Sequence, residues 1–253
     1  TASGDNITLF INLDTVMQIY ENLLSNSIRY AKSDIAISVV IENDNLVISV
    51  SDDGCGFKNI EIESLTFVVL KEHIEKFAID QKIKEFYPDA RINVIPEVLP
   101  GAVLTCKAGV TNIENDQPII FNDCDHLFLC SCKNNEFESI DGGLLTFKSH
   151  DPKFSFVAYD ENGYVNHTVE KQAISEDAIC GAYYFRNKQI FEDAVEIYLE
   201  NCSYNEFFVS GVYNVMAEQG EKIKSFNVDQ HVSFGTPDEF EEAKGDVTYK
   251  KLL

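Results

Sequence analysis

The sequence lacks any long apolar run. A helix that crosses a bilayer needs about 20 consecutive apolar residues, and no stretch of this chain approaches that length. The opening residues, TASGDNITLF, also lack the basic and apolar regions of a signal peptide. They begin with Thr1 rather than Met, which predicts a processed or shortened chain. We therefore expect a cytoplasmic protein that does not insert into membranes.

Basic residues are scarce. The 253 residues include 20 Lys and Arg against 42 Asp and Glu, so the formal net charge is −22. Such a negative field repels nucleic acids and anionic membranes, which excludes both as expected partners. A phosphorylated ligand would therefore need local help from a metal ion or from backbone N–H groups.

A C-x-x-C motif is also missing, and the seven cysteines are an odd number. Cys130 and Cys132 flank Ser131, and the other cysteines are scattered. One interpretation is a metal site that combines this pair with His126. The interpretation we favour is a set of buried, reduced thiols in a cytosolic protein.

The chain is long enough for a sizeable core, and 45% of its residues are hydrophobic. Two kinds of pattern meet near residues 57–64. Before that point, ITLFI at residues 7–11 predicts a strand, and residues 15–31 predict an amphipathic helix. DIAISVVIEN and LVISVSDD alternate between apolar and polar residues on either side of DN at residues 44–45, which predicts a hairpin.

After residue 57, strands and helices alternate. The patterns predict a strand in SLTFVVL, a helix over residues 71–86, a strand in ARINVIPE, a helix over residues 101–113 and a strand in PIIFNDCD. This rhythm predicts a parallel sheet with crossover helices. An antiparallel meander follows from about residue 141, and then come helices over 187–202 and 204–220 and a last helix capped by Thr236. The expected fold class is α/β, with a mainly parallel Rossmann-like sheet plus the meander, preceded by an α+β segment.

The helix expected near residues 15–31 carries polar residues that suit a nucleotide. In ENLLSNSIRYA, Asn22 and Asn26 lie four residues apart and share a helix face, and Arg29 follows one turn later. Amide oxygens suit Mg²⁺, and a guanidinium group suits phosphate. After the hairpin, DDGCGF places acids before two glycines that let backbone approach a ligand closely. Each piece taken alone favours an ordinary surface helix and a glycine turn.

Together and in this order, ENLLSNSIRYA and DDGCGF resemble the N box and the first glycine box of histidine-kinase-type (GHKL) ATPase domains. The resemblance implies that Asn26 binds Mg²⁺ and that Glu21 stands where the family carries an acid or His acting on a water or substrate. It also implies a nucleotide site formed by Asn22, Asn26, Arg29, Tyr30, Asp52, Gly54 and Gly56. The lid and second G-x-G motif of the family do not follow Phe57. We therefore expect residues 1–57 to be a partial ATPase segment.

A second cluster of polar residues ends the strand expected in PIIFNDCD. Asp123 and Asp125 lie two residues apart, so their side chains share a face of an extended strand. Ligands of open α/β sheets bind at the carboxyl ends of strands, and paired carboxylates there suit a divalent cation bound to phosphates. The alternative interpretation, equally supported by this stretch alone, is a solvated turn.

A wider pattern resembles the sugar-phosphate nucleotidyltransferases, which make nucleotide-activated sugars. It runs in order through PEVLPGAVLTCKAG, IIFNDCDHLF, FVAYDENGYVNHTVEK, ICGAYYF and VSFGTPDEFEEA. The resemblance implies Asp125 as a catalytic Mg²⁺ ligand with Asp123 beside it. It implies that Glu170 and Lys171 hold the sugar and its phosphate, with Lys171 also catalytic. Gly181 then lies at the sugar, and Gly101 lies near the base.

Two departures limit this resemblance. The family opens with a strand and a G-x-G-x-R-like loop that holds the triphosphate, and residues 1–57 stand in that place. Ser233 and Phe234 occupy the usual position of the second metal-binding Asp. Asp229, four residues before Ser233, is a substitute for that Asp that we do not favour. Residues 58–253 are thus expected to form a GT-A-like domain without its first strand and triphosphate loop.

Three functional hypotheses follow. The first is a Mg²⁺-dependent nucleotidyltransferase that joins a nucleoside triphosphate and a sugar-1-phosphate, with weak or no catalysis because the triphosphate loop is absent. The second is the ATP-binding domain of a sensor histidine kinase. The third is a non-catalytic fusion, or chimera, of two truncated domains. Nucleotides and sugar phosphates are the expected ligands. The sequence names neither the base nor the sugar, and it leaves the oligomeric state open.

Overall fold

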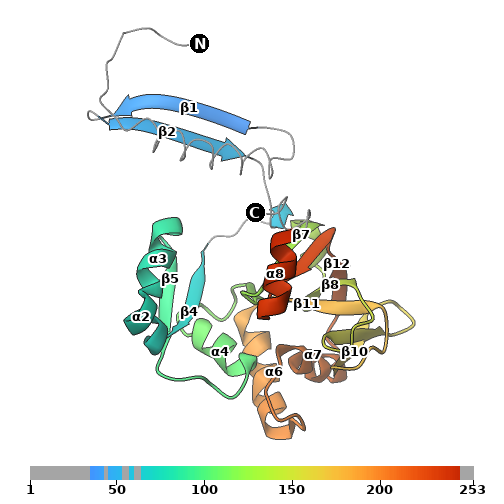
Figure 1. Cartoon of the computed structure of the whole chain (residues 1–253). Coiled ribbons are helices and arrows are strands. Elements are labelled where there is room, and N and C mark those ends of the chain that lie inside the picture. The colour runs from blue at the N-terminus through green and yellow to red at the C-terminus, as the bar shows by residue number, and fades with distance from the viewer. Residues whose placement is uncertain (1–34, 43–44, 53–56, 60–63, 246–253) are drawn as a thin grey trace.

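The protein is described from a computed structural model, shown in Figure 1, which covers residues 35–42, 45–52, 57–59 and 64–245. Side chains are described for residues 64–243. The strand expected at residues 7–11 and the helix expected at 15–31 lie outside the described residues. Among the described helices, none combines the length and the apolar character that a membrane span needs.

A two-stranded antiparallel sheet comes first. β1 (Ile35–Glu42) pairs with β2 (Asn45–Asp52) along its whole length, from Ile35 opposite Asp52 to Glu42 opposite Asn45. Both strands alternate apolar and polar residues, the pattern of a sheet with unlike faces. The pairing confirms the predicted hairpin.

The largest sheet has six strands and a mixed direction. Its order is β10-β9-β11-β8-β12, and β6 also pairs with β11. Only β12 runs parallel to its neighbour β8, while the other pairs of this sheet are antiparallel. The strands are β6 (Ile119–Asn122), β8 (Gly142–Lys148), β9 (Ser155–Tyr159), β10 (Val165–Glu170), β11 (Asp177–Phe185) and β12 (Ile223–Asn227).

The expectation of a mainly parallel sheet is therefore wrong for the described strands, although the α/β class is right. The strand-helix-strand rhythm produces parallel pairing only between β4 (Thr66–Leu70) and β5 (Arg91–Ile95), which form a separate sheet. The helix expected between them is split into α2 (Lys71–Phe77) and α3 (Ile79–Phe86). The break lies at Ala78, whose φ of 50° is left-handed and ends the first helix.

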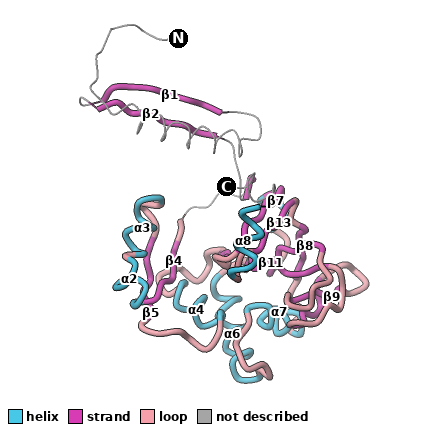
Figure 2. The backbone as a smooth tube through the Cα atoms, viewed as in Figure 1, coloured by secondary structure: helices cyan, strands magenta, loops and turns pink. Residues whose placement is uncertain are grey.

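A third sheet joins distant parts of the chain in the order β13-β7-β3. β7 (His126–Lys133) pairs antiparallel with β13 (Gln230–Ser233) and parallel with β3 (Phe57–Asn59). The backbone trace in Figure 2 shows β7 and β13 together beside α8. No strand was expected at residues 126–133, so β7 is a new element.

Helices α4 (Ala102–Gly109), α6 (Lys188–Asn201) and α7 (Val209–Glu218) supply the rest of the main core, and α5 (Asn134–Phe137) is a single turn. Two helix caps are clear. Asn187 accepts a hydrogen bond from the N–H of Ile190 at 2.9 Å and caps α6. Thr236 and Glu239 form a reciprocal pair at the start of α8 (Pro237–Gly245), which confirms the predicted cap at Thr236.

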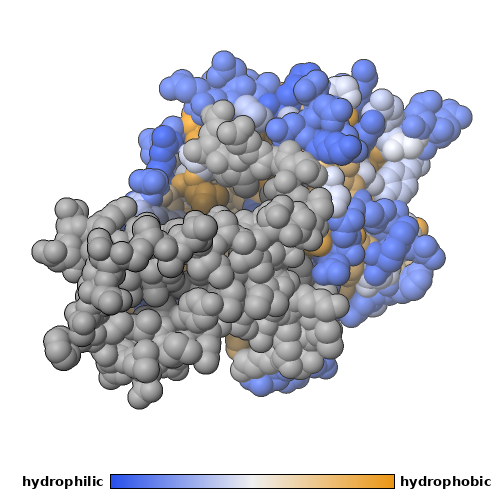
Figure 3. Space-filling view, turned by 90° about the horizontal axis from the view of Figure 1, so that it is seen from above, coloured by the Kyte–Doolittle hydropathy of each residue, from blue (hydrophilic) through white to orange (hydrophobic). Residues whose placement is uncertain are grey.

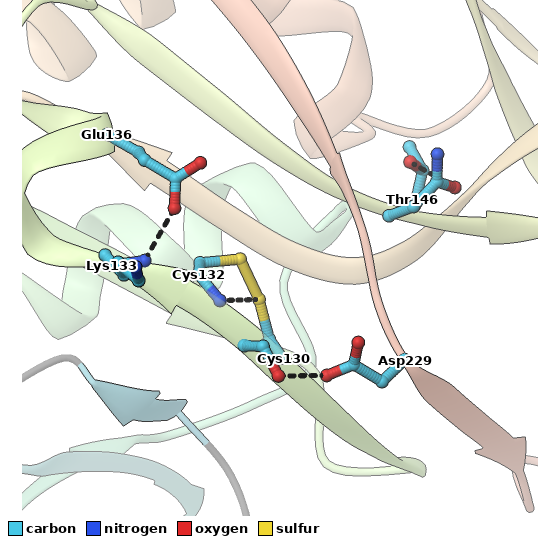
Figure 4. The surroundings of a disulfide bond; sticks show 8 residues. Cys130, Cys132, Lys133, Glu136, Thr146 and Asp229 are labelled. Carbon is cyan, nitrogen blue, oxygen red and sulfur yellow. Dashed lines mark hydrogen bonds between the residues drawn. A yellow bond between two sulfur atoms is a disulfide. The ribbon is translucent and has the colours of Figure 1, made fainter.

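The cysteines differ from expectation at one pair. Cys130 and Cys132 form a disulfide bond on β7, shown in Figure 4, so the expectation of reduced thiols is wrong for them. The reason is local geometry, because residues two apart on a strand point to the same face. Both cysteines lie in a second buried apolar cluster with Phe137 and Ile140. The described free cysteines are Cys106, Cys124, Cys180 and Cys202.

Candidate functional site

The site begins where β6 ends. Its last residue leads into Asp123, Cys124 and Asp125, which connect directly to β7. The N–H of Asp123 donates to the carbonyl of Gly181 at 2.9 Å, and the N–H of Phe234 donates to the carbonyl of Asp125 at 2.9 Å. The connection is thereby fixed on one side to β11 and on the other to the segment that follows β13. Both aspartates stay exposed, as a ligand site requires.

Two glycines hold backbone against the two carboxylates. A Cβ at Gly181 would lie 2.6 Å from Asp123 Oδ2 and 2.7 Å from His126 Cε1, and Gly181 has a φ of +84°. A Cβ at Gly235 would lie 2.6 Å from Asp125 Oδ2. Any side chain at either position would displace a carboxylate, so the glycines shape the site. Gly181 was expected at the sugar, and it lies beside Asp123. Gly235 was missed, although it belongs to the SFGTP stretch.

Two acids and two histidines lie in this cluster, and their surroundings shift the pKa values of Asp123, His126 and His231. Asp123 is exposed as a whole residue, but neighbouring protein groups partly desolvate its carboxyl and Asp125 repels its charge, which together raise the pKa of Asp123 to about 6. Burial lowers the pKa of His126. Burial and the neighbouring His126 lower the pKa of His231 to about 4. The two imidazole rings lie 5.6 Å apart, and His231 stacks on Phe147 with 3.9 Å between ring centres.

The expected sugar-binding pair ends β10. Glu170 Oε1 accepts hydrogen bonds from the hydroxyl of Ser155 at 2.6 Å and from that of Ser210, which fixes the direction of the carboxylate. Lys171 has a left-handed φ of 55° and is exposed, with its Nζ 5.5 Å from the centre of the Phe208 ring. The two serines come from β9 and α7, so sequence spacing did not identify them.

Buried Tyr183 lies on β11, in the same sheet as β6 and β10, the strands that lead to the two parts of the site. Burial, followed by the charges of Asp123 and Glu170, raises the pKa of its hydroxyl well above the ordinary value. The structure thus brings the Asp123 and Glu170 groups to one sheet.

The surroundings of Gly101 differ from those expected near a nucleotide base. It has a φ of 111°, and a Cβ there would lie 2.4 Å from the backbone nitrogen of Phe207 and 2.7 Å from its carbonyl oxygen. The N–H of Val103 donates to the same carbonyl at 3.1 Å. The close approach of two backbones therefore accounts for glycine at this position. Its expected role at the nucleotide stays a prediction.

The described residues contain no group of three or more His, Cys, Asp or Glu side chains that could hold a metal ion. The predicted cation site at Asp123 and Asp125 has only two such side chains. The alternative metal site formed by Cys130, Cys132 and His126 receives no support. Asp229 accepts from Ser131 Oγ at 2.6 Å on the flank of β7. The predicted ATP-site residues lie outside the described side chains, and these are Glu21, Asn22, Asn26, Arg29, Tyr30, Asp52, Gly54 and Gly56.

Comparison with solved structures identifies the fold. The nucleoside-diphosphate-sugar pyrophosphorylase from Vibrio cholerae RC9 matches with a TM-score of 0.63 and 19% identity, over 70% of this chain and 78% of that protein. The inositol-1-phosphate CTP transferase from T. maritima matches with a TM-score of 0.56 and 12% identity, over 76% of each chain. This chain therefore has a nucleotidyltransferase-like α/β fold.

The front of the chain matches a different family. The protein-family model described as "Histidine kinase-, DNA gyrase B-, and HSP90-like ATPase" matches residues 11–86, which confirms that the front segment resembles this family. The match continues past residue 57 through α2 and α3. The chaperone protein HtpG of Clostridium botulinum (strain Loch Maree / Type A3) is 23% identical over 256 residues, which cover 92% of this chain and 38% of that protein. The chain thus spans about two fifths of the length of this relative.

Proposed function

We propose that residues 58–253 form a sugar-phosphate nucleotidyltransferase domain that joins a nucleoside triphosphate to a sugar-1-phosphate. The observation that carries the proposal is the pair Asp123 and Asp125 at the end of β6, held against backbone at Gly181 and Gly235. Glu170 and Lys171, at the end of β10, supply the second half of the site. The similarity to solved nucleotidyltransferases supports this assignment through the fold.

In the proposed reaction, a phosphate oxygen of the sugar-1-phosphate attacks the α-phosphorus of the triphosphate. A new phosphorus–oxygen bond forms, the bond between the α-phosphorus and its bridging oxygen breaks, and pyrophosphate leaves with that oxygen. No covalent residue is required, because positioning and charge neutralisation supply the rate. Exposed Lys171 would neutralise phosphate charge, and Glu170, fixed by two serine hydroxyls, would orient the sugar.

The residues present fit a magnesium ion. Mg²⁺ in proteins is usually bound through one or two carboxylates together with substrate phosphates, and Asp123 and Asp125 are two exposed carboxylates on one connection. The raised pKa of Asp123 follows from desolvation and from the repulsion of Asp125, a repulsion that a bound cation would relieve. When bound, the ion would supply charge neutralisation at the phosphates.

A pyrophosphate-release assay tests the proposal. The full chain would be incubated with Mg²⁺, each common nucleoside triphosphate and a panel of sugar-1-phosphates. We expect slow release that requires both substrates and is lost in Asp125→Asn, while Asp229→Asn, on the flank of β7, retains it. Release that is absent with every substrate pair would contradict the transferase and leave a non-catalytic fusion.

A second candidate function is ATP binding by the front segment, which the family match over residues 11–86 favours. In this alternative, Asn26 holds Mg²⁺ and Asp52 accepts from the adenine amine. The discriminating experiment is a thermal melt with Mg-ATP. A stabilisation that Asn26→Ala abolishes and Asp125→Asn leaves intact assigns nucleotide binding to the front segment.

A further inference from the structure

An ion pair joins the loop before β9 to helix α8. Lys153 Nζ lies 2.5 Å from Glu239 Oε1 and 3.5 Å from Asp151 Oδ2. The hydrogen bond between Lys153 and Glu239 raises the pKa of the ammonium group and lowers the pKa of the carboxyl group, so both are charged at neutral pH. The Lys153 side chain is 48% exposed. A ligand that arrives from solvent can therefore reach its ammonium group.

The backbone at Lys153 is fixed beside the expected sugar-binding residues. The carbonyl of the next residue, Phe154, accepts from the N–H of Lys171 at 3.1 Å. Ser155 is paired with Glu170 across β9 and β10. Lys153 therefore stands two residues before the strand partner of Glu170.

The other member of the ion pair, Glu239, leads to the expected cation site. Glu239 Oε2 accepts from the N–H of Thr236 at 3.0 Å, so one carboxylate holds both Lys153 and the start of α8. Thr236 directly follows Gly235, the glycine that lies against Asp125 Oδ2. The ion pair thus connects the two halves of the candidate site, the acids that follow β6 and the residues that end β10.

A second set of contacts, which does not involve α8, runs from Lys153 to the same acids. Lys153 Nζ lies 4.9 Å from the centre of the Phe154 ring, and that centre lies 6.5 Å from the ring centre of His231. The rings of His231 and His126 lie 5.6 Å apart, and His126 directly follows Asp125. Side chains therefore link Lys153 to the connection between β6 and β7.

We propose that Lys153 is a phosphate-binding residue of the candidate site, and that Glu239 holds its ammonium group until a ligand phosphate replaces the carboxylate. The inference rests on the proposed function, which supplies the phosphorylated ligands. In a chain of net charge −22, ligand phosphates need local cations, and Lys153 adds a second ammonium group to that of Lys171. Lysine binds phosphate as a point charge. Ion pairs at exposed positions contribute little net free energy, so the exchange of partners costs little.

Isothermal titration calorimetry on the full chain, with Mg²⁺ present, tests the inference with two probes, inorganic pyrophosphate and glucose 1-phosphate. We expect Lys153→Gln to weaken the binding of one probe by about tenfold, because a charge-assisted contact to phosphate is lost. Glu239→Gln removes the competing carboxylate and should tighten the same probe by roughly threefold or more. The probe that responds shows whether Lys153 serves the triphosphate or the sugar phosphate.

A double variant separates competition for Lys153 from simple packing of α8. If Glu239 acts through the ammonium group, the gain from Glu239→Gln disappears when Lys153→Gln is also present. Lys76→Gln and Glu72→Gln are the matched controls, because they break another exposed ion pair, on α2. Both controls should leave the affinity for the two probes unchanged.

Three results would overturn the inference. The first is a Lys153→Gln protein that binds both probes as the parent does. The second is weaker binding in both single variants, which would make the pair a structural contact that only positions α8. The third is the absence of binding of either probe to the parent and to Glu239→Gln.

The transferase assignment fails or stands separately from this inference. Pyrophosphate release that requires Asp125 and survives Lys153→Gln, together with unchanged binding of both probes, would keep the assignment and remove only Lys153. Probe binding that depends on Lys153, without release from any substrate pair, would keep the phosphate-binding residue and contradict the transferase.

Discussion

At the scale of single residues, Gly181 is one of the two glycines that lie directly against a carboxylate of the site, that of Asp123. The positive φ of Gly181 and the 2.6 Å between an added Cβ and Asp123 Oδ2 act on the same position. Gly163 offers a separation of the two effects, because it has a φ of +79° and no atom within 4 Å of an added Cβ. The pair distinguishes the cost of backbone conformation from the cost of crowding an acid.

We predict that Gly181→Ala lowers the free energy of unfolding by more than Gly163→Ala does. Both variants force alanine into a left-handed conformation, which costs on the order of 1–3 kcal/mol. Gly181→Ala must in addition displace the Asp123 side chain or the His126 ring. Urea unfolding followed by circular dichroism measures the difference. Equal losses in the two variants would show that the carboxylate does not press on this glycine.

The lowered pKa of His231 predicts acid sensitivity. In the unfolded chain its pKa is near 6.5, and in the fold it is about 4, so folding favours the neutral ring. The stability that His231 contributes is complete above pH 6.5 and is lost as the pH falls toward 4. We expect His231→Phe, which keeps the stacking on Phe147, to reduce this loss by on the order of 1–2 kcal/mol, allowing for solvent screening. Unfolding by urea between pH 4 and 7 tests it, and a pH profile unchanged by the substitution would contradict it.

At the scale of elements, the hydroxyl of Tyr213 is one of the groups that join α7 to the main sheet. Fully buried Tyr213 Oη lies 3.0 Å from the carbonyl oxygen of Gly143 and 2.8 Å from that of Tyr184. These carbonyls belong to the neighbouring strands β8 and β11. The contact fixes α7 across two strands and thereby positions Ser210, which bonds to Glu170.

We predict that Tyr213→Phe costs about 1–3 kcal/mol of stability, because two buried carbonyls lose their shared donor. Tyr204→Phe, at an exposed position, is the control and should change stability by less than about 0.5 kcal/mol. Chemical denaturation of the three proteins measures the effect. A Tyr213→Phe protein as stable as the parent would show that water or another group satisfies both carbonyls.

The predictability of the elements follows from the range of the interactions that form them. α6, α8 and the turn between β9 and β10 depend on local signals, such as the cap at Asn187 and the bonds from Asp160 to the N–H groups of Asn162 and Tyr164. The antiparallel meander of β8 to β11 was predicted and is confirmed. The antiparallel pairing of β6 with β11 has no local signal in the sequence and was not predicted. β7 was missed because its partners, β3 and β13, lie far away in the sequence.

The residues of the candidate site also fall into those with a local sequence signal and those brought together by tertiary folding. Asp123 and Asp125 were predicted because they end an apolar run, and Glu170 and Lys171 because they match a motif. Gly235, His231 and the two serines that hold Glu170 reach the site only through tertiary folding. The residues expected from the ATPase resemblance lie outside the described part, so their roles stay predictions.

At the scale of the whole molecule, the protein combines an acidic surface with proposed ligands that are themselves anionic. The space-filling view in Figure 3 shows hydrophilic residues over much of the visible described surface. With a net charge of −22, general electrostatic attraction cannot recruit a nucleotide. Affinity for the proposed ligands would therefore have to come from local groups, and we expect binding to be sensitive to single substitutions and to Mg²⁺.

The most direct test of the transferase assignment is the melting temperature with a panel of nucleotide sugars and Mg²⁺. A ligand that binds only the native state raises that temperature. We predict a rise with at least one nucleotide sugar at millimolar concentration that is lost in Asp125→Asn and Lys171→Gln and retained in Asn26→Ala. No rise with any nucleotide sugar, or a rise that survives both site substitutions, would contradict it.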